Sequence, residues 1–183
     1  MLPLVRFPIE TDRLLIRPMR PDDAEDLHEV YSDVETMAYL TSEIPRVVDD
    51  TRAWMAPKVA QQERYGISLW SVVERASGKV IGDCGLQTED ETLSEVELGF
   101  RFNRRYWGRG YALEACAACV AVAFDQLGLQ RLVAGTDRDN ARGRRLLERL
   151  GMRHVREGVW FGRKMAEYEI SAAEWARTRR RGT

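Results

Sequence analysis

The sequence lacks the features that mark several classes of protein. Its 28 basic and 29 acidic side chains leave a formal charge of −1 at pH 7, so no general attraction to nucleic acid or anionic lipid is expected. No apolar run approaches the roughly 20 residues that a membrane-spanning helix needs. The N-terminal stretch MLPLVRFPIE also lacks the apolar centre of a signal peptide. We therefore expect a cytoplasmic protein with no membrane partner and no direct nucleic-acid partner.

Cysteine and histidine are also scarce. The three cysteines are an odd number, which together with the lack of an export signal favours a reducing compartment. Cys116 and Cys119 form a CxxC pair in the middle of a predicted helix, whereas a redox pair normally lies at a helix start, where the dipole lowers the thiol pKa. Only Cys84, His28 and His154 remain, and they are too scattered for a four-ligand zinc site. The cysteines are predicted to be small buried apolar residues, and no metal is expected.

The sequence does contain an ordered series of helix and strand patterns. With 183 residues and no repeat, low-complexity tract or linker, the chain is expected to form a single domain over residues 1–183. Three neighbouring strands separated by short polar turns predict an antiparallel meander, and the central strands cross over through helices. The predicted fold class is a mixed α/β domain, that is, an α+β mixed sheet. The predicted strands are 13–19, 68–75, 80–87, 93–102, 131–137, 153–162 and 164–171, and the predicted helices are 20–33, 110–127, 140–151 and a region 34–65 that is irregular around Ser42–Pro45.

The stretch NRRYWGRGYALEA (103–115) joins a predicted strand to a predicted helix through two glycines. The first N–H groups of a helix have no internal partners, and the helix dipole places partial positive charge there. Gly108 and Gly110 would let the backbone approach an anion closely. This turn is therefore a candidate anion or phosphate site. Its candidate ligands are the N–H groups of residues 107–112 and the side chains of Arg104, Arg105 and Arg109.

The spacing of this motif excludes two common nucleotide sites but leaves a simpler alternative. Arg105-x-x-Gly108-x-Gly110 matches neither GxGxxG nor GxxxxGK[ST], which argues against a dinucleotide-binding fold and a P-loop nucleotidase. The alternative is that the two glycines only shape a tight turn between strand and helix. The motif by itself does not decide between these interpretations.

Five stretches, taken in order, extend the pattern over nearly the whole chain. They are TDRLLIRPMRPDDAEDL (11–27), SGKVIGDCGL (77–86), VELGFRFNRRYWGRGYALEA (96–115), AFDQLGLQRLVAGTDRDNARGRRLLERLGM (123–152) and EYEISAAEW (167–175). Together they resemble the GNAT superfamily of N-acetyltransferases, and specifically its RimJ/RimL-like branch of ribosomal-protein N-terminal acetyltransferases and their relatives. The resemblance implies the GNAT acyl-CoA N-acyltransferase fold with splayed central strands.

The resemblance also implies acetyl-CoA as the acetyl donor, with its pyrophosphate held by the glycine turn. The strand ending GFRF would offer backbone hydrogen bonds to the pantetheine arm, and its splay from RLVAGTD would leave a V-shaped gap for the thioester. Asn140 matches a family asparagine that contacts this arm, although an asparagine there could equally cap its helix. The implied donor-binding residues are Phe100, Arg101, Phe102, Arg105, Trp107, Gly108, Arg109, Gly110, Tyr111, Ala112, Asn140 and Arg145.

Acetyl transfer to an amine requires removal of a proton from the amine and stabilisation of a tetrahedral oxyanion. Glu97 is the first candidate for the base, acting directly or through a water molecule, and Glu95 is the second. Strand alternation places both on the face opposite the apolar residues of this strand. The alternative for either carboxylate is a clamp for the substrate ammonium or a solvated strand face.

The proton donor for the leaving thiolate is missing from the family pattern. The RimJ/RimL-like branch commonly carries serine three residues after the asparagine, and other branches carry tyrosine seven residues after it. Here these positions are Gly143 and Leu147, and neither side chain can donate a proton. We expect an active enzyme that uses water in this role. The alternative is a CoA-binding sensor or interaction module with weak or no catalysis.

The acceptor is expected to be an amine, either a protein N-terminal α-amine or a small molecule. Large aromatic residues in the segments that cover the acceptor side in this superfamily are candidates for the substrate site, or for core packing. The basic end RTRRRGT (177–183) is expected to be disordered, with attachment to a ribosome or RNA as the alternative. A homodimer is also expected. The candidate substrate-binding residues are Tyr31, Trp54 and Trp70.

Overall fold

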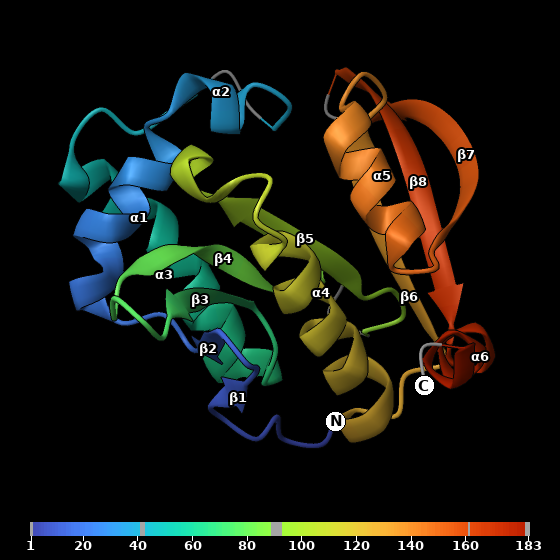
Figure 1. The fold of residues 1–183 in the computed structure, drawn as a ribbon. Helices are drawn as coiled ribbons and strands as arrows, with labels where there is room; N and C mark the ends of the chain where they lie inside the picture. The colour runs from blue at the N-terminus through green and yellow to red at the C-terminus, as the bar shows by residue number, and fades with distance from the viewer. Residues whose placement is uncertain (1, 41–42, 89–92, 161, 182–183) are drawn as a thin grey trace.

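The structure, a computed structural model, describes residues 2–40, 43–88, 93–160 and 162–181. Eight strands form one sheet in the order β1-β2-β3-β4-β5-β6-β8-β7, with helices on both faces (Figure 1). The strands are β1 (Ile9–Glu10), β2 (Leu14–Arg17), β3 (Leu69–Glu74), β4 (Val80–Gln87), β5 (Glu97–Phe102), β6 (Arg131–Asp137), β7 (Arg153–Trp160) and β8 (Arg163–Ser171). The helices are α1 (Ala24–Tyr31), α2 (Val34–Met37), α3 (Val48–Tyr65), α4 (Tyr111–Ala121), α5 (Ala141–Arg149) and α6 (Ala172–Arg181).

The sheet confirms the predicted mixed α/β class and its antiparallel parts. Strands β3, β4 and β5 form the predicted meander, and β7 pairs with β8 as the predicted closing pair. The chain crosses from β5 to β6 through α4, which makes β5–β6 the one parallel pairing among the described strands.

The splay between β5 and β6 is also present. The register pairs these two strands only at Glu97 and Val133, and the Val133 N–H donates to the Val96 carbonyl over 3.1 Å. By contrast, β4 and β5 pair continuously from Gln87–Glu97 to Gly82–Phe102. Strand β5 therefore keeps its β4 partner along its length but leaves β6 after its first residue.

Apolar side chains fill both faces of the sheet. One core packs α4 and the end of α5 against the sheet, and a second core packs α1 and α3 on the other side. Leu98 and Phe102 of β5 belong to the first core, which fixes the orientation of the strand. Residues that alternate with them, among them Glu97 and Arg101, therefore point toward α1 and α3. Strand β5 thus presents its polar residues on the α3 side.

The three cysteines are buried and free, as the sequence predicts. The Sγ atoms of Cys84 in β4 and Cys116 in α4 lie 3.6 Å apart inside the first core. Burial raises the pKa of all three thiols, which keeps them protonated and unreactive.

Several predicted boundaries are corrected by the structure. The predicted helix 20–33 is a 3-10 turn over Pro21–Asp23 followed by α1, and the predicted region 34–65 divides into α2 and α3. The predicted strand 93–102 begins only at Glu97, and β1 was not predicted. The predicted helix 110–127 is α4 followed by a π-helical turn over Val122–Gln126. Ser42, Phe161 and the last two residues lie outside the described ranges.

The prediction of a disordered C-terminal end is wrong for the described residues, because α6 continues to Arg181. Ser171 and Glu174 form a reciprocal cap at the start of this helix. The Ser171 N–H and hydroxyl both donate to Glu174 Oε2, over 2.8 and 2.7 Å. The Trp175 side chain is buried beside Phe124, with ring centres 6.5 Å apart. The S-x-x-E pattern followed by an apolar residue is a helix-start signal that the sequence analysis overlooked.

No helix in the described part of the chain is both long enough and apolar enough to cross a bilayer.

Candidate functional site

The glycine turn between β5 and α4 has the backbone shape that an anion site requires. Gly108 and Gly110 have φ angles of +74° and +83°, in the left-handed region that glycine adopts without strain. Both are exposed, and a Cβ atom at Gly108 would meet no heavy atom within 4 Å. Gly110 caps the start of α4, so the first N–H groups of this helix, including those of Tyr111 and Ala112, lack intrahelical partners. The predicted backbone donors therefore lie together at an exposed helix start.

Arg13, just before β2, holds this turn in place from the other end of the sequence. Its Nη1 donates to the Arg109 carbonyl over 2.9 Å, and its Nε donates to Glu114 Oε2 over 2.7 Å. Its guanidinium also lies 4.3 Å from the ring centre of Tyr111. The hydroxyl of Tyr111 in turn donates to Glu74 at the end of β3. Sequence reasoning missed Arg13, since no local motif connects it to a turn about a hundred residues away.

The three arginines of the turn have two kinds of neighbour, acidic side chains and an aromatic ring. Two of them face acidic residues around α1 and α2, whereas Arg109 lies at the turn with its guanidinium 5.7 Å from the Tyr106 ring centre. The predicted positive charge at the turn therefore comes from Arg109 and from the helix start. The ion pairs are Arg104 with Asp33 and Glu35, and Arg105 with Glu29.

Trp107 connects the turn to β5 and to α5. Its indole N–H donates to the Phe102 carbonyl over 2.8 Å, and the guanidinium of Arg142 lies 5.0 Å from its ring centre. Arg142 therefore brings a cation from α5 beside the glycine turn. The predicted residue Arg145 is also on α5 and is exposed. Sequence reasoning placed several arginines on this helix but could not tell which one contacts the turn.

The backbone of β5 has unpaired groups along the edge that faces β6. The Leu86 N–H donates to the Ser68 carbonyl over 2.9 Å, so the backbone groups of Leu86 point away from β5. In an antiparallel pair the opposite residue, Leu98, must then point its own groups away from β4, as must Phe100 two residues later. Because β6 diverges after Glu97, these N–H and C=O groups are available for an extended ligand.

Glu97 lies where the two strands separate. Its Oε1 accepts from the Gly135 N–H of β6 over 3.0 Å, and its Oε2 accepts from the Gln87 side chain over 3.1 Å. The carboxylate is half-buried and thus stands at the start of the gap. Glu95 lies before β5, is exposed and pairs with Arg131 at the surface. The structure therefore separates the two predicted carboxylates.

Asn140 caps α5, and both its amide oxygen and its amide nitrogen form hydrogen bonds. Its Oδ1 accepts from the Gly143 N–H over 3.0 Å, and its Nδ2 donates to Thr136 Oγ1 over 3.1 Å. A Cβ atom at Gly143 would lie 2.6 Å from Asn140 Nδ2 and 2.8 Å from Thr136 Oγ1, so a serine here would require the Asn140 or Thr136 side chain to shift. Leu147 is fully buried in the core. Neither position therefore supplies a hydroxyl to the gap.

The aromatic residues predicted for the acceptor side differ in exposure. Tyr31 and Trp70 are fully buried, and the Trp70 indole donates to Gln62 Oε1 over 2.7 Å. Trp54 is half-buried, with its ring centre 6.1 Å from that of Tyr31. Tyr31 and Trp70 are closed off by packing, so their side chains are not accessible to an acceptor.

A buried polar cluster lies between β4, β5 and α1. Asp83 is completely buried, and it accepts from Arg101 over 3.0 and 2.5 Å and from the Tyr31 hydroxyl over 2.5 Å. Burial and the Asp83 carboxylate raise the pKa of Tyr31 well above its ordinary value. Burial lowers the pKa of Arg101, but the attraction of Asp83 and Tyr31 outweighs this effect and raises it. The Arg101 side chain therefore points to this cluster, and its backbone groups face β4, not the gap.

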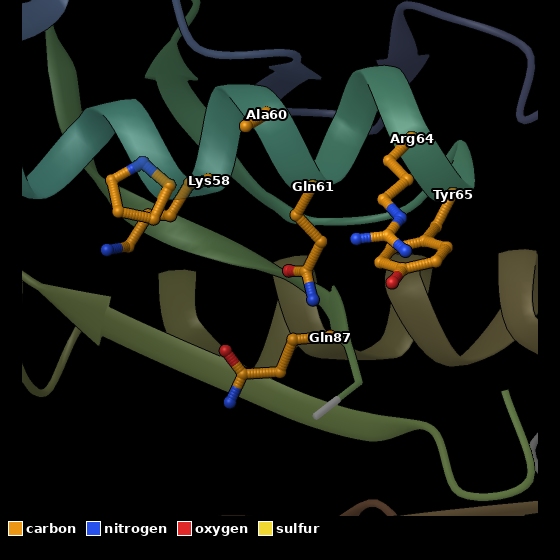
Figure 2. A pocket seen from close by; sticks show the side chains of 7 residues that line it. Lys58, Ala60, Gln61, Arg64, Tyr65 and Gln87 are labelled. Carbon is orange, nitrogen blue, oxygen red and sulfur yellow. The ribbon is translucent and has the colours of Figure 1, made fainter. Parts of the chain in front are cut away.

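A hollow of about 470 Å³ opens between α3 and the end of β4 (Figure 2). Strand alternation directs Glu97 to this same side of the sheet. Gln61 and Gln87 face one another across the hollow (Figure 2). On α3, Lys58 lies before Gln61 and Arg64 lies after it (Figure 2). Gln87 both lines this hollow and donates to Glu97, so the hollow adjoins the start of the β5–β6 gap. The lining residues are Pro57, Lys58, Ala60, Gln61, Arg64, Tyr65 and Gln87.

Comparison with known proteins decides the family. The family described as "Acetyltransferase (GNAT) domain" matches residues 13–153. The chain belongs to the GNAT acetyltransferase family.

Relatives of this GNAT chain span most of its length. It is 31% identical over 163 residues to the uncharacterized protein YkkB of Bacillus subtilis (strain 168), covering 87% of this chain and 92% of YkkB. It is also 31% identical over 155 residues to the uncharacterized N-acetyltransferase YoaA of the same organism, covering 84% of this chain and 86% of YoaA. The crystal structure of a GNAT-family acetyltransferase from Bacillus anthracis shares the fold, with a TM-score of 0.78 at 24% identity over 90% of this chain and 98% of that one.

The family match contains the whole candidate site of this GNAT domain. The glycine turn, the β5–β6 gap and the hollow beside α3 all lie within residues 13–153. Among the described residues, no group of three or more His, Cys, Asp or Glu side chains could hold a metal ion. The site therefore consists of backbone N–H groups, arginines, amides and one carboxylate at the strand separation.

Proposed function

We propose that this protein transfers the acetyl group of acetyl-CoA to an amine by direct attack in a ternary complex. The observation that carries the proposal is the β5 edge left unpaired beside an exposed helix start with two left-handed glycines. An extended chain with amide groups and a pyrophosphate at one end fits this combination, because amides extend a free strand edge and phosphates bind helix starts. Acetyl-CoA has both features.

The donor would lie along β5 with its pyrophosphate at the turn. The backbone of Leu98 and Phe100 would pair with the pantetheine amides, and the N–H groups at the start of α4 would bind the phosphates. Arg109 and Arg142 are the side chains placed to add positive charge around the phosphates. In this arrangement the thioester reaches the gap beside Glu97.

Glu97 is the group proposed to take a proton from the amine, directly or through a water molecule. Its carboxylate already accepts two hydrogen bonds, from Gly135 and Gln87, which hold it at the separation of β5 and β6. The nitrogen then attacks the thioester carbon, the C–S bond breaks, and the CoA thiolate leaves. Since Gly143 has no hydroxyl and Leu147 is a buried apolar residue, solvent water is the proposed proton source for the thiolate.

The hollow beside α3 is the proposed approach for the acceptor, because it adjoins Glu97 on the face opposite the α4 core. Two acceptor classes follow from this. The resemblance to the RimJ/RimL-like branch favours a protein N-terminal α-amine, whereas a hollow of about 470 Å³ lined by one helix and one strand has room for a small amine.

A free-thiol release assay tests the proposal, with acetyl-CoA and two panels of acceptors, short peptides and small amines. Release of CoA together with an N-acetylated product is the expected result. Calorimetric binding of acetyl-CoA with no product from any amine would replace the proposal with a CoA-binding sensor. Failure to bind acetyl-CoA at all would exclude both functions.

A further inference from the structure

Lys58 on α3 is a partly buried ammonium without an acidic partner. Its Nζ donates to the Trp54 carbonyl, one helical turn earlier, over 2.8 Å, and lies 5.9 Å from the centre of the Tyr31 ring. Within the described part of the chain it forms no ion pair with Asp or Glu. An amine that loses hydration without gaining a carboxylate is destabilised in its charged form. Burial and the nearby Arg101 accordingly lower the pKa of Lys58 to about 8.

The charges around Lys58 leave one positive charge unbalanced. Asp83 is the carboxylate that acts on Lys58 from β4, but both of its oxygens are already used by Arg101 and Tyr31. Tyr31 is neutral at physiological pH because burial raises its pKa. Two cations thus share one carboxylate in a partly dehydrated place beside the hollow.

The hollow next to Lys58 is lined by groups that can bind an anion. None of its described lining residues is acidic, and Gln61 and Gln87 add amide groups across from each other (Figure 2). The Gln61 Nε2 atom donates to the Thr88 carbonyl over 2.6 Å, which fixes the orientation of this amide. Arg64 lines the same hollow, with its guanidinium 5.1 Å from the Tyr65 ring centre.

The hollow and the proposed base are joined by a single side chain. Gln87 lines the hollow and donates to Glu97 Oε2 over 3.1 Å. A ligand could therefore place its nitrogen at Glu97 and an anionic group in the hollow, on either side of Gln87. This matches a small amine that carries its own acidic group.

Building on the proposed function, we infer that Lys58 binds the anionic group of the acceptor, and that the preferred substrate is a small amine that carries a carboxylate. An acceptor carboxylate would supply the partner that the Lys58 ammonium lacks. A hydrogen bond to a charged group contributes about 1.5–3 kcal/mol, which corresponds to roughly 10- to 100-fold in kcat/KM.

Matched pairs of acceptors test this inference. The twenty standard L-amino acids are compared with their carboxamides, and phosphoethanolamine is compared with ethanolamine, in the thiol release assay with product identification. The wild-type protein is expected to favour free acids over carboxamides by roughly 10-fold or more. A larger preference for phosphoethanolamine over ethanolamine would show that the hollow selects a phosphate and overturn the assignment to a carboxylate. Equal rates for the two members of each pair would overturn the inference. Faster acetylation of the N-terminal amine of peptides without acidic groups would overturn it as well.

Variants of Lys58 assign the effect to this side chain. Lys58→Met is expected to abolish the preference for acids, measured within that variant as the ratio of kcat/KM for each acid to that of its carboxamide, and Lys58→Arg is expected to keep this preference. Lys79→Met, which removes an exposed lysine from the β3–β4 turn, serves as the control. A preference that persists in a folded Lys58→Met protein would contradict the assignment.

If no amine is acetylated although acetyl-CoA binds, the proposed function fails. If amines are acetylated without an acid preference, only the present inference fails.

The pH dependence provides a second readout. Lys58 is charged below its pKa of about 8 and loses its proton above it, so the preference for acids should decline as the pH rises through 8. Of the groups that face Lys58, Arg101 stays protonated and Tyr31 stays neutral in this range, because the pKa of each is raised. Asp83 is already paired with both. Lys58→Arg should remove the decline, and a decline that remains in this variant would assign the titration to another group.

Discussion

The two halves of the site differ in how they are encoded. The glycine turn and the free edge of β5 come from one continuous stretch, residues 96–115, and their chemistry depends mainly on the backbone. The hollow beside α3 is assembled from α3 and the end of β4, and its chemistry depends on side chains that meet only after folding. The comparison teaches that a candidate site built on backbone groups, such as the proposed donor site, can be predicted from spacing, whereas one built on side chains, such as the proposed acceptor site, requires the structure. The predictions below test each half, beginning with the largest expected effect.

Glu97 lies at the boundary between the two halves, so its loss should abolish transfer and leave donor binding intact. Glu97→Gln is expected to lower kcat at neutral pH by about 10²- to 10⁴-fold, the range for loss of a general base. Acetyl-CoA affinity, measured by calorimetry, should stay within a few-fold. Glu95→Gln is the matched control, since Glu95 pairs with Arg131 at the surface. An unchanged pH–rate profile in Glu97→Gln would remove Glu97 as the base.

Binding of acetyl-CoA at the glycine turn should require that residue 110 carries no negative charge. Gly110→Asp places a carboxylate at the start of α4, where the pyrophosphate is proposed to bind, and a like charge there costs several kcal/mol. We expect acetyl-CoA affinity to fall by more than about 100-fold. Gly110→Asn has a similar size and the same left-handed backbone but no charge, and should weaken binding far less. If the Asp variant is folded and binds acetyl-CoA normally, the assignment of the turn is wrong.

Gly143 tests whether the missing hydroxyl reflects packing. Gly143→Ser would put a Cβ atom 2.6 Å from Asn140 Nδ2 and 2.8 Å from Thr136 Oγ1. Overpacking of this kind costs about 1–3 kcal/mol in the free energy of unfolding, which urea denaturation can measure. The same variant should show no gain in kcat. A stable variant with faster turnover would mean that the helix can accept a side-chain proton donor at this position.

Arg13 tests the support of the turn from outside the motif. Arg13→Met removes the hydrogen bonds to the Arg109 carbonyl and to Glu114, so the turn should lose its fixed geometry. We expect acetyl-CoA affinity to fall by roughly 10-fold, corresponding to about one hydrogen bond to a charged group. Arg75→Met is a suitable control, because the Arg75 side chain is similarly exposed and its described contacts are with Glu10 and the Thr11 carbonyl, whereas the backbone bond from Arg75 to Arg13 is kept in the variant. Equal affinity in both variants would show that the turn holds its shape without Arg13.

The parts of the molecule that sequence reasoning predicts correctly are those with local causes. Alternating apolar residues predict the strands β3, β4 and β5 of the meander. The two glycines after β5 predict the turn that leads into α4. The end of the chain was mispredicted although its signal was local. Its basic composition suggested disorder, while the cap formed by Ser171 and Glu174 and the burial of Trp175 establish α6.

The rest of the site depends on contacts between distant segments. Arg13 reaches Arg109 across the fold, and Gln87 reaches Glu97 from the neighbouring strand. Spacing along the chain carries no information on either contact. Exposure is equally hidden, since an aromatic residue such as Trp70 can line a pocket or fill a core with the same sequence pattern. Lys58 became a candidate only when its surroundings were known.

The most direct test of the central claim is a calorimetric titration of the wild-type protein with acetyl-CoA, followed by addition of amines to the saturated complex and identification of the products by mass spectrometry. Our account predicts saturable binding of one acetyl-CoA per chain and then an N-acetylated amine formed in equal amount to free CoA. A protein that does not bind acetyl-CoA, or that binds it and acetylates no amine, would contradict the account.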